Sequence, residues 1–479
     1  MGIQASASFA CPTSSEPTSS TDLRPQNCGG VLKLFQIGTK MKKVVLFFPK
    51  LEPNKDFHYF PLSLLSISSL LVEQGIECLI IDERVNENFE QKLIEAMDGA
   101  LCFGTTAFTG YQLARAYAAL KLIKQKFPNI PVILGGQHIT NTPDQTLKSD
   151  FIDIGVIGYG EYIFKELINR MIINQPIEEI EGVAYTDGEG NIKVNPPSRK
   201  FDVDILPSLP YQLIDIEKYV NPATKRFMYI SSYGCPGICT FCATPNQRKW
   251  LPLPIERLKK DLNYLFNKYD FRQILFFDAT LFTLPDRLVE IAELIKQYNI
   301  SWIADGRALE MYRLDDEYIQ KLIDSGLKQV TVGLETGSRH VAAIMKKGKE
   351  HLEKFETVAR KLRKFDVALI SGLIFGTPGE TVADLKETIE CIKKIKSINR
   401  NFRLSSTFFR PLPGTELFHD LKREGYPFPD DLEAWAKEGG NTHYKYNQWM
   451  DVPWFDEKTK QEYRKIYSQF IEEHQGILV

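Results

Sequence analysis

The stretch Tyr233-Gly234-Cys235-Pro236-Gly237-Ile238-Cys239-Thr240-Phe241-Cys242 places three cysteines on one short loop, with the spacing C-x3-C-x2-C. It directly follows an apolar run, Phe227 to Ser232, whose pattern predicts a strand. Three thiolates at this spacing can bind three irons of a four-iron, four-sulfur ([4Fe-4S]) cluster and leave the fourth iron open. The loop therefore predicts an iron-sulfur centre, with Cys235, Cys239 and Cys242 as its ligands, at the carboxyl end of a strand.

A structural zinc site is the alternative interpretation of the same loop. Such sites are closed by four Cys or His ligands, and neither a histidine nor a fourth cysteine lies near residues 235–242. The spacing therefore favours the cluster. The chain has only 8 cysteines in 479 residues, which is no disulfide framework and predicts a reducing compartment.

Outward from the loop, short apolar runs alternate with helical periodicity from Lys42 onward, the pattern of βα units on parallel sheets. It forms two blocks, which predict an α/β protein. We expect the following order: a disordered leader (1–40), a doubly wound, flavodoxin-like domain (41–175), a hairpin and linker (176–222), a partial TIM (β/α)6 barrel (223–416) and a C-terminal extension (417–479).

Ligand-binding candidates in the first block lie in the loops that follow its strands. These loops are Thr105-Thr106, Gly135-Gly136-Gln137-His138 and Gly158-Tyr159-Gly160-Glu161. Glycines let the backbone approach a bulky ligand closely. No glycine-rich phosphate loop follows the first strand, which argues against dinucleotides and nucleoside triphosphates.

The cysteine spacing, the aromatic Phe241 before the last cysteine and the position after the first barrel strand resemble the radical S-adenosylmethionine (SAM) superfamily. The similarity is to its cobalamin (B12)-binding branch, the class B methyltransferase-like enzymes, from Lys42 to about Glu416. The resemblance implies that the open iron binds the methionine part of S-adenosylmethionine. Electron transfer from the cluster would then release a 5′-deoxyadenosyl radical.

The same resemblance implies contacts to S-adenosylmethionine. Phe241 would lie against the adenine, Glu335 would reach the ribose or the amino group, and Arg307 would pair with the carboxylate. The segment Gly372-Leu373-Ile374-Phe375-Gly376 resembles the strand whose backbone reads the adenine, so Gly372, Ile374 and Gly376 are candidates. The alternatives are a satisfied strand-end carboxylate for Glu335 and an ordinary surface ion pair for Arg307.

One position departs from the family pattern. Many relatives carry a Gly-Gly-Glu-like or Asp-Asp pair after the second barrel strand, whereas this chain has Asp278-Ala279-Thr280. The resemblance therefore implies only that Asp278 stands where the amino-group contact is expected.

For the upstream domain the resemblance implies cobalamin. Its corrin would lie over the sheet edge formed by the loops named above, with Thr105, Thr106, Gly135, Gly136, Gln137, His138, Gly158, Gly160 and Glu161 as contacts. The Asp-x-His-x-x-Gly pattern that supplies a histidine ligand to cobalt elsewhere is missing, so we expect cobalamin without histidine ligation. His138 would touch the corrin edge or nucleotide tail, and the alternative is a capping or turn histidine.

The resemblance favours a cobalamin-dependent radical methyltransferase acting on an unactivated carbon of a small molecule, lipid or natural product. Ring formation or oxidation on a tetrapyrrole or other natural product is the second enzyme hypothesis. A non-catalytic corrinoid or redox sensor is the hypothesis from another class. Methylthiolation of transfer RNA is disfavoured because the upstream domain offers only Cys78 and Cys102, both in apolar strands, for a second cluster.

Composition restricts the partners. Lys plus Arg total 59 against 61 Asp plus Glu, a formal net charge of −2, so we expect no nucleic acid. The longest apolar runs fall short of the roughly 18 residues that span a bilayer, so we expect no transmembrane segment and a cytoplasmic location. The resemblance implies an external electron donor, such as a flavodoxin or ferredoxin, as protein partner.

Overall fold

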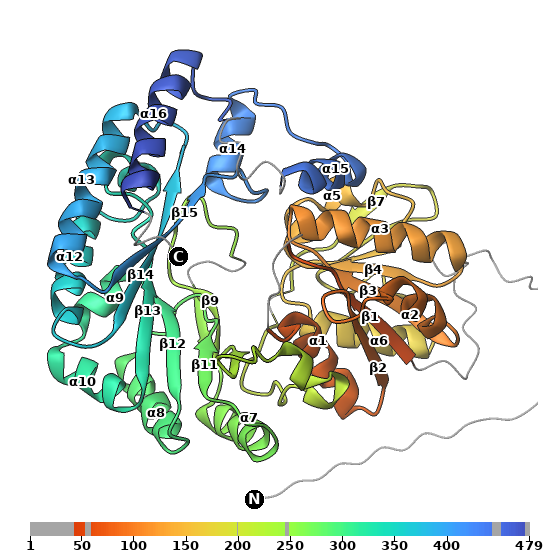
Figure 1. The fold of residues 1–479 in the computed structure, drawn as a ribbon. Coiled ribbons are helices and arrows are strands. Elements are labelled where there is room, and N and C mark those ends of the chain that lie inside the picture. Colours follow the sequence, from red (N-terminus) through yellow and green to blue (C-terminus); the bar gives the residue numbers. More distant parts are fainter. Residues whose placement is uncertain (1–42, 53–58, 199, 245–248, 443–451, 475–479) are drawn as a thin grey trace, which may run out of the picture.

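A computed structural model describes residues 43–52, 59–198, 200–244, 249–442 and 452–474. Two sheets lie side by side, and each is covered by helices (Figure 1). The strands of the first sheet are mainly parallel, and those of the second are all parallel. The predicted leader of residues 1–40 lies outside the described residues.

The first sheet has seven strands in the order β2-β1-β3-β4-β5-β6-β7. Its first five strands are parallel and follow the flavodoxin-like order 2-1-3-4-5. The predicted hairpin is present, and it extends this sheet as two antiparallel strands. The strands are β1 (Lys43–Phe48), β2 (Glu77–Asp82), β3 (Ala100–Thr106), β4 (Val132–Gly135), β5 (Ile154–Val156), β6 (Val183–Thr186) and β7 (Ile192–Val194).

Helices cover both faces of this sheet because its central strands are apolar on both sides. On β1, Val44 and Leu46 pack in one hydrophobic core with α1 and α6, while Val45 and Phe47 pack in another with α2 and α3. The doubly wound prediction is therefore confirmed. The helices are α1 (Leu62–Glu73), α2 (Phe89–Ala96), α3 (Tyr111–Lys126), α4 (Gln137–Asn141), α5 (Pro143–Thr146) and α6 (Glu161–Ile172).

The second sheet contains six parallel strands in the order β15-β14-β13-β12-β11-β8, so β8 and β15 are unpaired edges and the barrel is partial. This confirms the predicted (β/α)6 architecture. The strands are β8 (Arg226–Tyr229), β11 (Gln273–Phe276), β12 (Ser301–Gly306), β13 (Leu327–Val332), β14 (Ala368–Phe375) and β15 (Phe402–Phe408). The helices are α7 (Ile255–Lys268), α8 (Pro285–Lys296), α9 (Ala308–Arg313), α10 (Asp316–Asp324), α11 (Arg339–Ile344), α12 (His351–Leu362) and α13 (Val382–Ile398).

A separate two-stranded ribbon carries the start of the cysteine loop. It pairs β9 (Ser232–Cys235) with β10 (Lys249–Pro252) in antiparallel register. The predicted first barrel strand, Phe227 to Ser232, is thus divided, since β8 ends at Tyr229 and β9 begins at Ser232.

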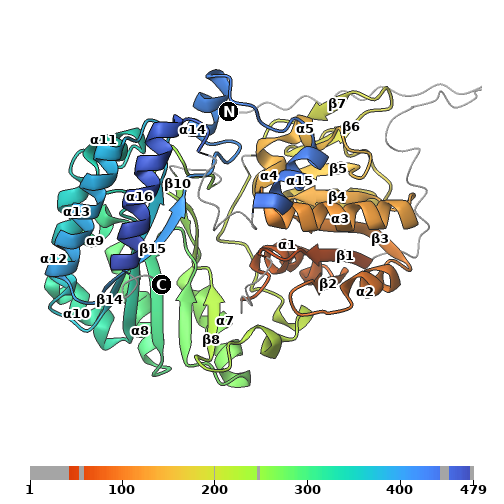
Figure 2. The same cartoon turned by 45° about the horizontal axis from the view of Figure 1, so that its top comes forward.

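The C-terminal extension contacts both sheet layers (Figure 2). Following α14 (Glu416–Arg423), helix α15 (Leu432–Thr442) packs against α3, whereas α16 (Glu457–Glu473) packs against α13. Gly439 lies so close to the backbone of Gly110 that a side chain there would collide with it. The extension therefore joins the upstream helices to the barrel helices.

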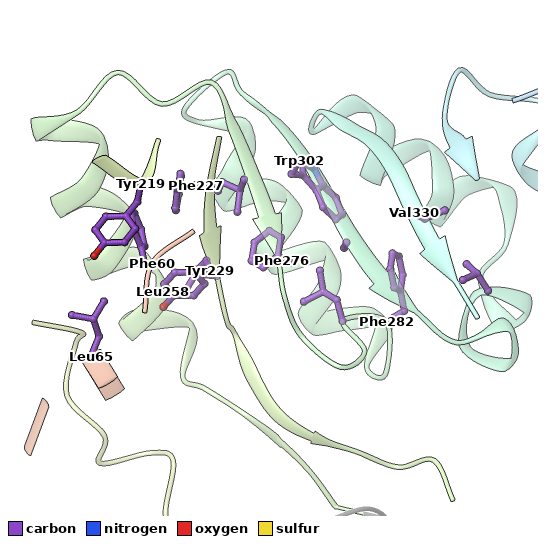
Figure 3. Close-up of a cluster of buried hydrophobic side chains, with 14 of the residues drawn as sticks. Phe60, Leu65, Tyr219, Phe227, Tyr229, Leu258, Phe276, Phe282, Trp302 and Val330 are labelled. Carbon is purple, nitrogen blue, oxygen red and sulfur yellow. The ribbon is translucent and has the colours of Figure 1, made fainter. Parts of the chain in front are cut away.

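One hydrophobic core continues from the first sheet into the second (Figure 3). Phe60, just before α1, contacts Tyr211 and Tyr219 of the linker and stacks on Phe227 of β8 at 6.3 Å. Farther along, Phe276 and Trp302 pack edge to face at 6.0 Å on the helix-covered side of the barrel. The contact between Phe60 and Phe227 fixes the start of β8 against the upstream domain.

Candidate functional site

The three predicted cluster ligands lie on one loop at the end of β9. The side chains of Cys235, Cys239 and Cys242 are partly buried thiols. Gly234 adopts a left-handed backbone with φ of 75°, which turns the chain into the loop. The N–H of Gly237 donates to Cys235 Sγ at 3.3 Å. These contacts hold the thiols at the carboxyl end of the barrel.

The middle of the loop is fixed to two other elements. Thr240 donates from Oγ1 to the carbonyl of Ile344 at 2.9 Å, at the end of α11. The N–H of Leu417, in the first turn of α14, donates to the carbonyl of Thr240 at 3.1 Å. Thr240, which lies between Cys239 and Cys242, is therefore fixed against α11 and α14.

Cationic side chains lie beside the thiols. A Cβ on Gly237 would lie 3.3 Å from Cys235 Sγ and 3.6 Å from Arg307 Nε, so the guanidinium and the sulfur approach the same spot. Burial raises the pKa of Cys235 and Cys239, while Arg307 and Lys347 oppose that rise. Buried thiols that need a nearby positive charge to ionise suit a metal centre, which supplies that charge.

The donor set fits a cluster better than a single ion. Within the described part of the chain, no three His, Cys, Asp or Glu side chains converge closely enough to hold one metal ion. A four-iron cluster has no such requirement, since each thiolate binds its own iron. Assignment of the three cysteines to a cluster remains a prediction that this geometry supports.

Glu335 and Lys347 form a nearly buried ion pair near the cysteine loop. Lys347 Nζ lies 3.2 Å from Glu335 Oε1, with side-chain exposures of 11% and 16%. Glu335 has a positive φ of 64°, an uncommon conformation for a side chain of this size. Lys347 was not identified from the sequence, because nothing in Met345-Lys346-Lys347-Gly348 distinguishes it from a surface lysine.

The candidate adenine strand is tied to Glu335 through its backbone. The N–H of Glu335 donates to the carbonyl of Gly372 at 2.9 Å, and Ile374 returns a bond to the carbonyl of Glu335 at 2.8 Å. Phe241 and Ile374 pack against one small hydrophobic cluster. The structure therefore brings Phe241, Glu335, Gly372 and Ile374 into one region, as predicted contacts of one ligand would require.

Gly376, the third predicted adenine contact on this strand, has backbone partners in the C-terminal extension. Its N–H donates to Tyr463 Oη at 3.2 Å, and its carbonyl accepts from Trp454 Nε1 at 2.9 Å. Both backbone groups are therefore engaged by the C-terminal extension. Sequence reasoning missed these partners because they follow Gly376 by 87 and 78 residues and carry no motif.

Asp278 lies beneath the cysteine ribbon and has only 1% of its surface exposed. Its carboxylate accepts bonds from the N–H and hydroxyl of Ser231 and from the hydroxyl of Ser232. Burial raises its pKa to about 6. In this structure the carboxylate positions β9 through Ser231 and Ser232, and its role as an amino-group ligand stays a prediction.

Arg307 is partly exposed and lies at the end of β12, as its predicted role requires. It also contacts Glu310, at 3.5 Å between Nη1 and Oε1. Glu310 is 5% exposed and accepts a bond from the hydroxyl of Thr280. The partner of Arg307 is thus a buried carboxylate and not that of an ordinary surface ion pair, and it orients the guanidinium beside Cys235.

In the first sheet, several predicted cobalamin contacts meet at the carboxyl edge. Gly136 has a φ of 96°, and a Cβ there would lie 2.6 Å from Thr106 Oγ1. At Gly135 an added Cβ would make only ordinary contacts, the nearest at 3.9 Å to the carbonyl of Thr105, and at Gly158 it would meet no atom within 4 Å, so the backbone of Gly158 borders open space. Thr106, Gly135, Gly136 and Gly158 thus form a cradle that a flat ligand can approach.

Two further predicted contacts are structural in this conformation. Thr105 is buried and donates from Oγ1 to the carbonyl of Phe47 at 2.9 Å, which ties β3 to β1. Gly160 lies against Ile67, because a Cβ there would be 3.1 Å from the side chain of that residue. Thr105 and Gly160 therefore pack within the upstream domain and support the carboxyl edge of its sheet.

His138 is fully buried under α15 and has contacts of the kind expected for a turn histidine, while its contact to the corrin edge or nucleotide tail stays a prediction. Nδ1 lies 2.8 Å from Thr109 Oγ1, Nε2 lies 3.3 Å from Thr142 Oγ1, and the ring packs on Trp435 at 5.8 Å. Burial lowers its pKa to about 3, so the ring is neutral. The sequence did not reveal this because the covering residue lies 297 positions later.

Gln137 and Glu161 are also buried and connect the two sheets. Gln137 Nε2 donates to the carbonyl of Pro413 at 3.3 Å, just after β15. Glu161 Oε1 accepts from Ser66 Oγ at 2.7 Å and from Tyr233 Oη at 3.3 Å. Both side chains thus make interdomain contacts and neither is more than 6% exposed, while their contacts to cobalamin stay predictions.

These bonds show that the carboxyl edge of the first sheet faces the carboxyl end of the barrel. Exposed apolar side chains occur at the same edges: Phe108 follows β3 with 60% exposure, Ile238 lies in the cysteine loop with 44%, and Phe277 follows β11 with 55%. Sequence analysis did not single out these residues. Uncovered apolar groups on facing edges are typical of a site that binds large, partly apolar ligands.

Comparisons with known proteins agree with this geometry. The model of the radical SAM superfamily matches residues 229–392, and that of the B12 binding domain matches residues 55–168. An uncharacterized methyltransferase, PH0819 of Pyrococcus horikoshii, is 29% identical over 367 residues, covering 75% of this chain and 77% of that protein. The anaerobic magnesium-protoporphyrin IX monomethyl ester cyclase of Rubrivivax gelatinosus is 23% identical over 360 residues, covering 72% and 63%.

Among solved structures, the cobalamin-dependent S-adenosylmethionine radical enzyme OxsB, with aqua-cobalamin and S-adenosylmethionine bound, has the same fold. The TM-score is 0.71 at 17% identity, with 91% of this chain and 72% of that chain covered. A flavodoxin-like sheet ahead of a partial barrel with a three-cysteine loop defines a class of enzymes that use two cofactor domains. The chain carries the two domains of this class, a B12 binding domain and a radical SAM domain.

The described residues contain no helix that is both long and apolar enough to cross a membrane.

Proposed function

We propose that the protein is a cobalamin-dependent radical SAM methyltransferase that acts on an unactivated carbon of a small molecule, lipid or natural product. One observation carries this proposal: the cysteine loop of the barrel and the glycine cradle of the first sheet lie on facing edges. Gln137 and Pro413 join these edges at 3.3 Å, and Ser66 joins Tyr233 at 2.9 Å. Such an arrangement brings two cofactors to one substrate.

The cluster ligands in this proposal are Cys235, Cys239 and Cys242. When bound, the cluster supplies an electron, S-adenosylmethionine supplies the group that removes a hydrogen atom, and cobalamin supplies the methyl group. The role of the chain is to hold and orient these components.

Around the cluster, charged side chains bind the zwitterionic end of S-adenosylmethionine. Arg307, beside Cys235, is placed to pair with a carboxylate. Glu335 is placed to accept from an amino group or a ribose hydroxyl, and Lys347 Nζ lies 3.2 Å from its carboxylate. Phe241 and Ile374, which pack on one hydrophobic cluster, provide an apolar surface for the adenine.

In the upstream domain, Thr106, Gly135, Gly136 and Gly158 hold cobalamin at the sheet edge in this proposal. Phe108, which is 60% exposed, adds an apolar surface against the corrin. Histidine ligation to cobalt from His138 is excluded from the proposal, because the ring is fully buried and both its nitrogens have hydroxyl neighbours.

Ring formation is the second candidate function. It is favoured by the similarity to the magnesium-protoporphyrin IX monomethyl ester cyclase, which extends over 72% of this chain. A non-catalytic corrinoid or redox sensor is the third. Formation of 5′-deoxyadenosine separates both enzymes from the sensor, and S-adenosylhomocysteine, the product of cobalamin methylation, separates the methyltransferase from the cyclase.

The proposed partners follow from the same chemistry. A reduced flavodoxin or ferredoxin delivers the electron, and the proposed location is the cytoplasm, where the thiols Cys78, Cys102 and Cys391 remain free. Nucleic acid is not a proposed partner, since the net charge is −2.

Anaerobic reconstitution tests the proposal. The protein is loaded with iron, sulfide and hydroxocobalamin, passed through gel filtration, and then given S-adenosylmethionine and a strong reductant. Retained cobalt together with 5′-deoxyadenosine and S-adenosylhomocysteine is the expected result. A protein that keeps its iron but releases all cobalt would contradict the cobalamin assignment.

A further inference from the structure

A buried polar junction links the upstream domain to the cysteine loop. Tyr233, two residues before Cys235, places its hydroxyl 2.9 Å from Ser66 Oγ of α1. Ser66 donates to Glu161 Oε1 of α6 at 2.7 Å, and Tyr233 Oη lies 3.3 Å from the same oxygen. Ser66 and Glu161 are each 6% exposed. Three groups from three elements therefore share one water-excluded contact.

Aromatic packing holds the ring of Tyr233 in place. Tyr159, in the loop before α6, meets it edge to face at 5.4 Å, and Phe201 of the linker meets it edge to face at 5.1 Å. Tyr159 and Phe201 stack on each other at 4.3 Å. The ring is thus enclosed by upstream residues although it belongs to the barrel ribbon.

The junction acts at the opposite end of the barrel from the apolar contact between the domains. Phe60 meets Phe227 near the start of β8, whereas Tyr233 lies beyond the end of that strand, opposite Leu251 of β10. One apolar contact allows rotation, because hydrophobic packing has little directionality. Hydrogen-bonded contacts fix the angle, here the junction together with the bond from Gln137 to Pro413.

We infer that Ser66, Glu161 and Tyr233 form a positioning junction, which sets the separation between the cysteine loop and the cobalamin cradle. The role rests on the proposed function, since the separation matters only if both sites carry cofactors. Glu161, expected from the sequence to touch cobalamin, acts instead through Tyr233. Ser66 and Tyr233 were not among the sequence candidates for any site.

Geometry explains why this small contact controls the loop. Tyr233 and Cys235 are on the same short strand, so their Cα atoms are separated by at most about 7 Å. Gly234 between them has a fixed turn with φ of 75°. A displacement of the tyrosine hydroxyl is therefore transmitted to the first cluster ligand.

The test compares Tyr233→Phe and Ser66→Ala with wild type, and uses Tyr162→Phe as the matched control. Tyr162 also packs against Phe201, at 6.3 Å, but its hydroxyl donates to the carbonyl of Asp202 at 2.7 Å, outside the junction. Holoenzyme is reconstituted with cluster and cobalamin and reduced, and the cluster–cob(II)alamin distance distribution is measured by pulsed electron paramagnetic resonance.

We expect Tyr233→Phe to retain iron and cobalt but to give a distribution at least about twice as broad as wild type, because one buried hydrogen bond is lost. Ser66→Ala should broaden it as well. Tyr162→Phe should match wild type. An unchanged distribution in Tyr233→Phe, or equal broadening in the control, overturns the inference.

A second readout separates failure of the junction from failure of the proposed function. In the cofactor-free protein, amides of residues 234–242 should exchange hydrogen about five- to tenfold faster in Tyr233→Phe than in wild type, as expected for about one lost hydrogen bond. Equal exchange rates refute the junction. If wild type binds no cobalamin while the exchange difference is present, the proposed function fails, and with it the role in cofactor separation.

Discussion

The attachment of α16 to the barrel should weaken as pH rises, because it depends on a buried carboxylate. Glu380, which is 5% exposed, accepts from Thr377 N–H at 2.9 Å and from Tyr463 Oη at 2.9 Å. Tyr463 Oη in turn accepts from Gly376 N–H at 3.2 Å. Burial raises the pKa of Glu380 to about 7.

The sign follows from linkage between protonation and folding. In the unfolded chain Glu380 has its ordinary pKa of 4.5. Since the folded pKa is higher, the protonated carboxyl stabilises the fold fully below pH about 4.5, and this stabilisation is lost as pH rises through about 7. The difference corresponds to about 3 kcal/mol, or roughly a hundredfold in an opening equilibrium.

Glu380→Gln is the perturbation that isolates this group. The amide keeps the shape and remains neutral, so it does not titrate. Hydrogen exchange of the α16 amides is compared between variant and wild type at the same pH, which cancels the intrinsic exchange rate. We expect equal protection near pH 5 and up to about a hundredfold slower exchange in the variant near pH 8.

Glu462→Gln is the control, because Glu462 lies on the same helix but is exposed and forms only a 3.4 Å ion pair with Lys386. Its effect should stay below about 0.5 kcal/mol at either pH. A ratio of exchange rates between Glu380→Gln and wild type that is the same at pH 5 and pH 8 would refute the reasoning.

Three further changes test the site itself. Cys239→Ala should lower reconstituted iron below about a tenth of wild type, because one cluster ligand is lost, while Cys78→Ala, a core position, should keep it; metal analysis after gel filtration decides. His138→Gln should bind hydroxocobalamin within about twofold of wild type, yet lose about 1–3 kcal/mol of stability from its buried contacts in thermal unfolding; loss of cobalamin would restore a direct role. Gly136→Ala should cost about 1–3 kcal/mol, because of its φ of 96° and the clash with Thr106, and should reduce retained cobalt; unchanged stability would contradict the cradle geometry.

The local pattern of apolar residues was sufficient to predict the fold class. Apolar runs on both faces of β1 required helices on two sides, and the same alternation repeated through the barrel strands. These signals are local in the chain, so they can be read without knowing which strands pair. The cysteine spacing was sufficient for the cluster prediction for the same reason, since all three thiols lie within eight residues.

The exposure of the predicted ligand-binding residues could not be predicted from local sequence pattern. Gly136 and Gly158 have a positive φ, which is a property of the backbone itself and which glycine readily adopts. The surroundings of His138, Gln137 and Asp278 come instead from α15, from Pro413 and from Ser231. A polar residue in a loop looks the same in sequence whether it faces a ligand or a neighbouring element.

The sequence by itself determined two α/β blocks, their order and the three-cysteine loop, since each depends on periodicity or spacing over a short span. Only the tertiary structure decided that the two carboxyl edges face each other, that Glu161 binds Tyr233, and that Lys347 pairs with Glu335. Glu161 and Tyr233 are 72 residues apart, and the energy that joins them arises only after both sheets have formed and excluded water from the contact.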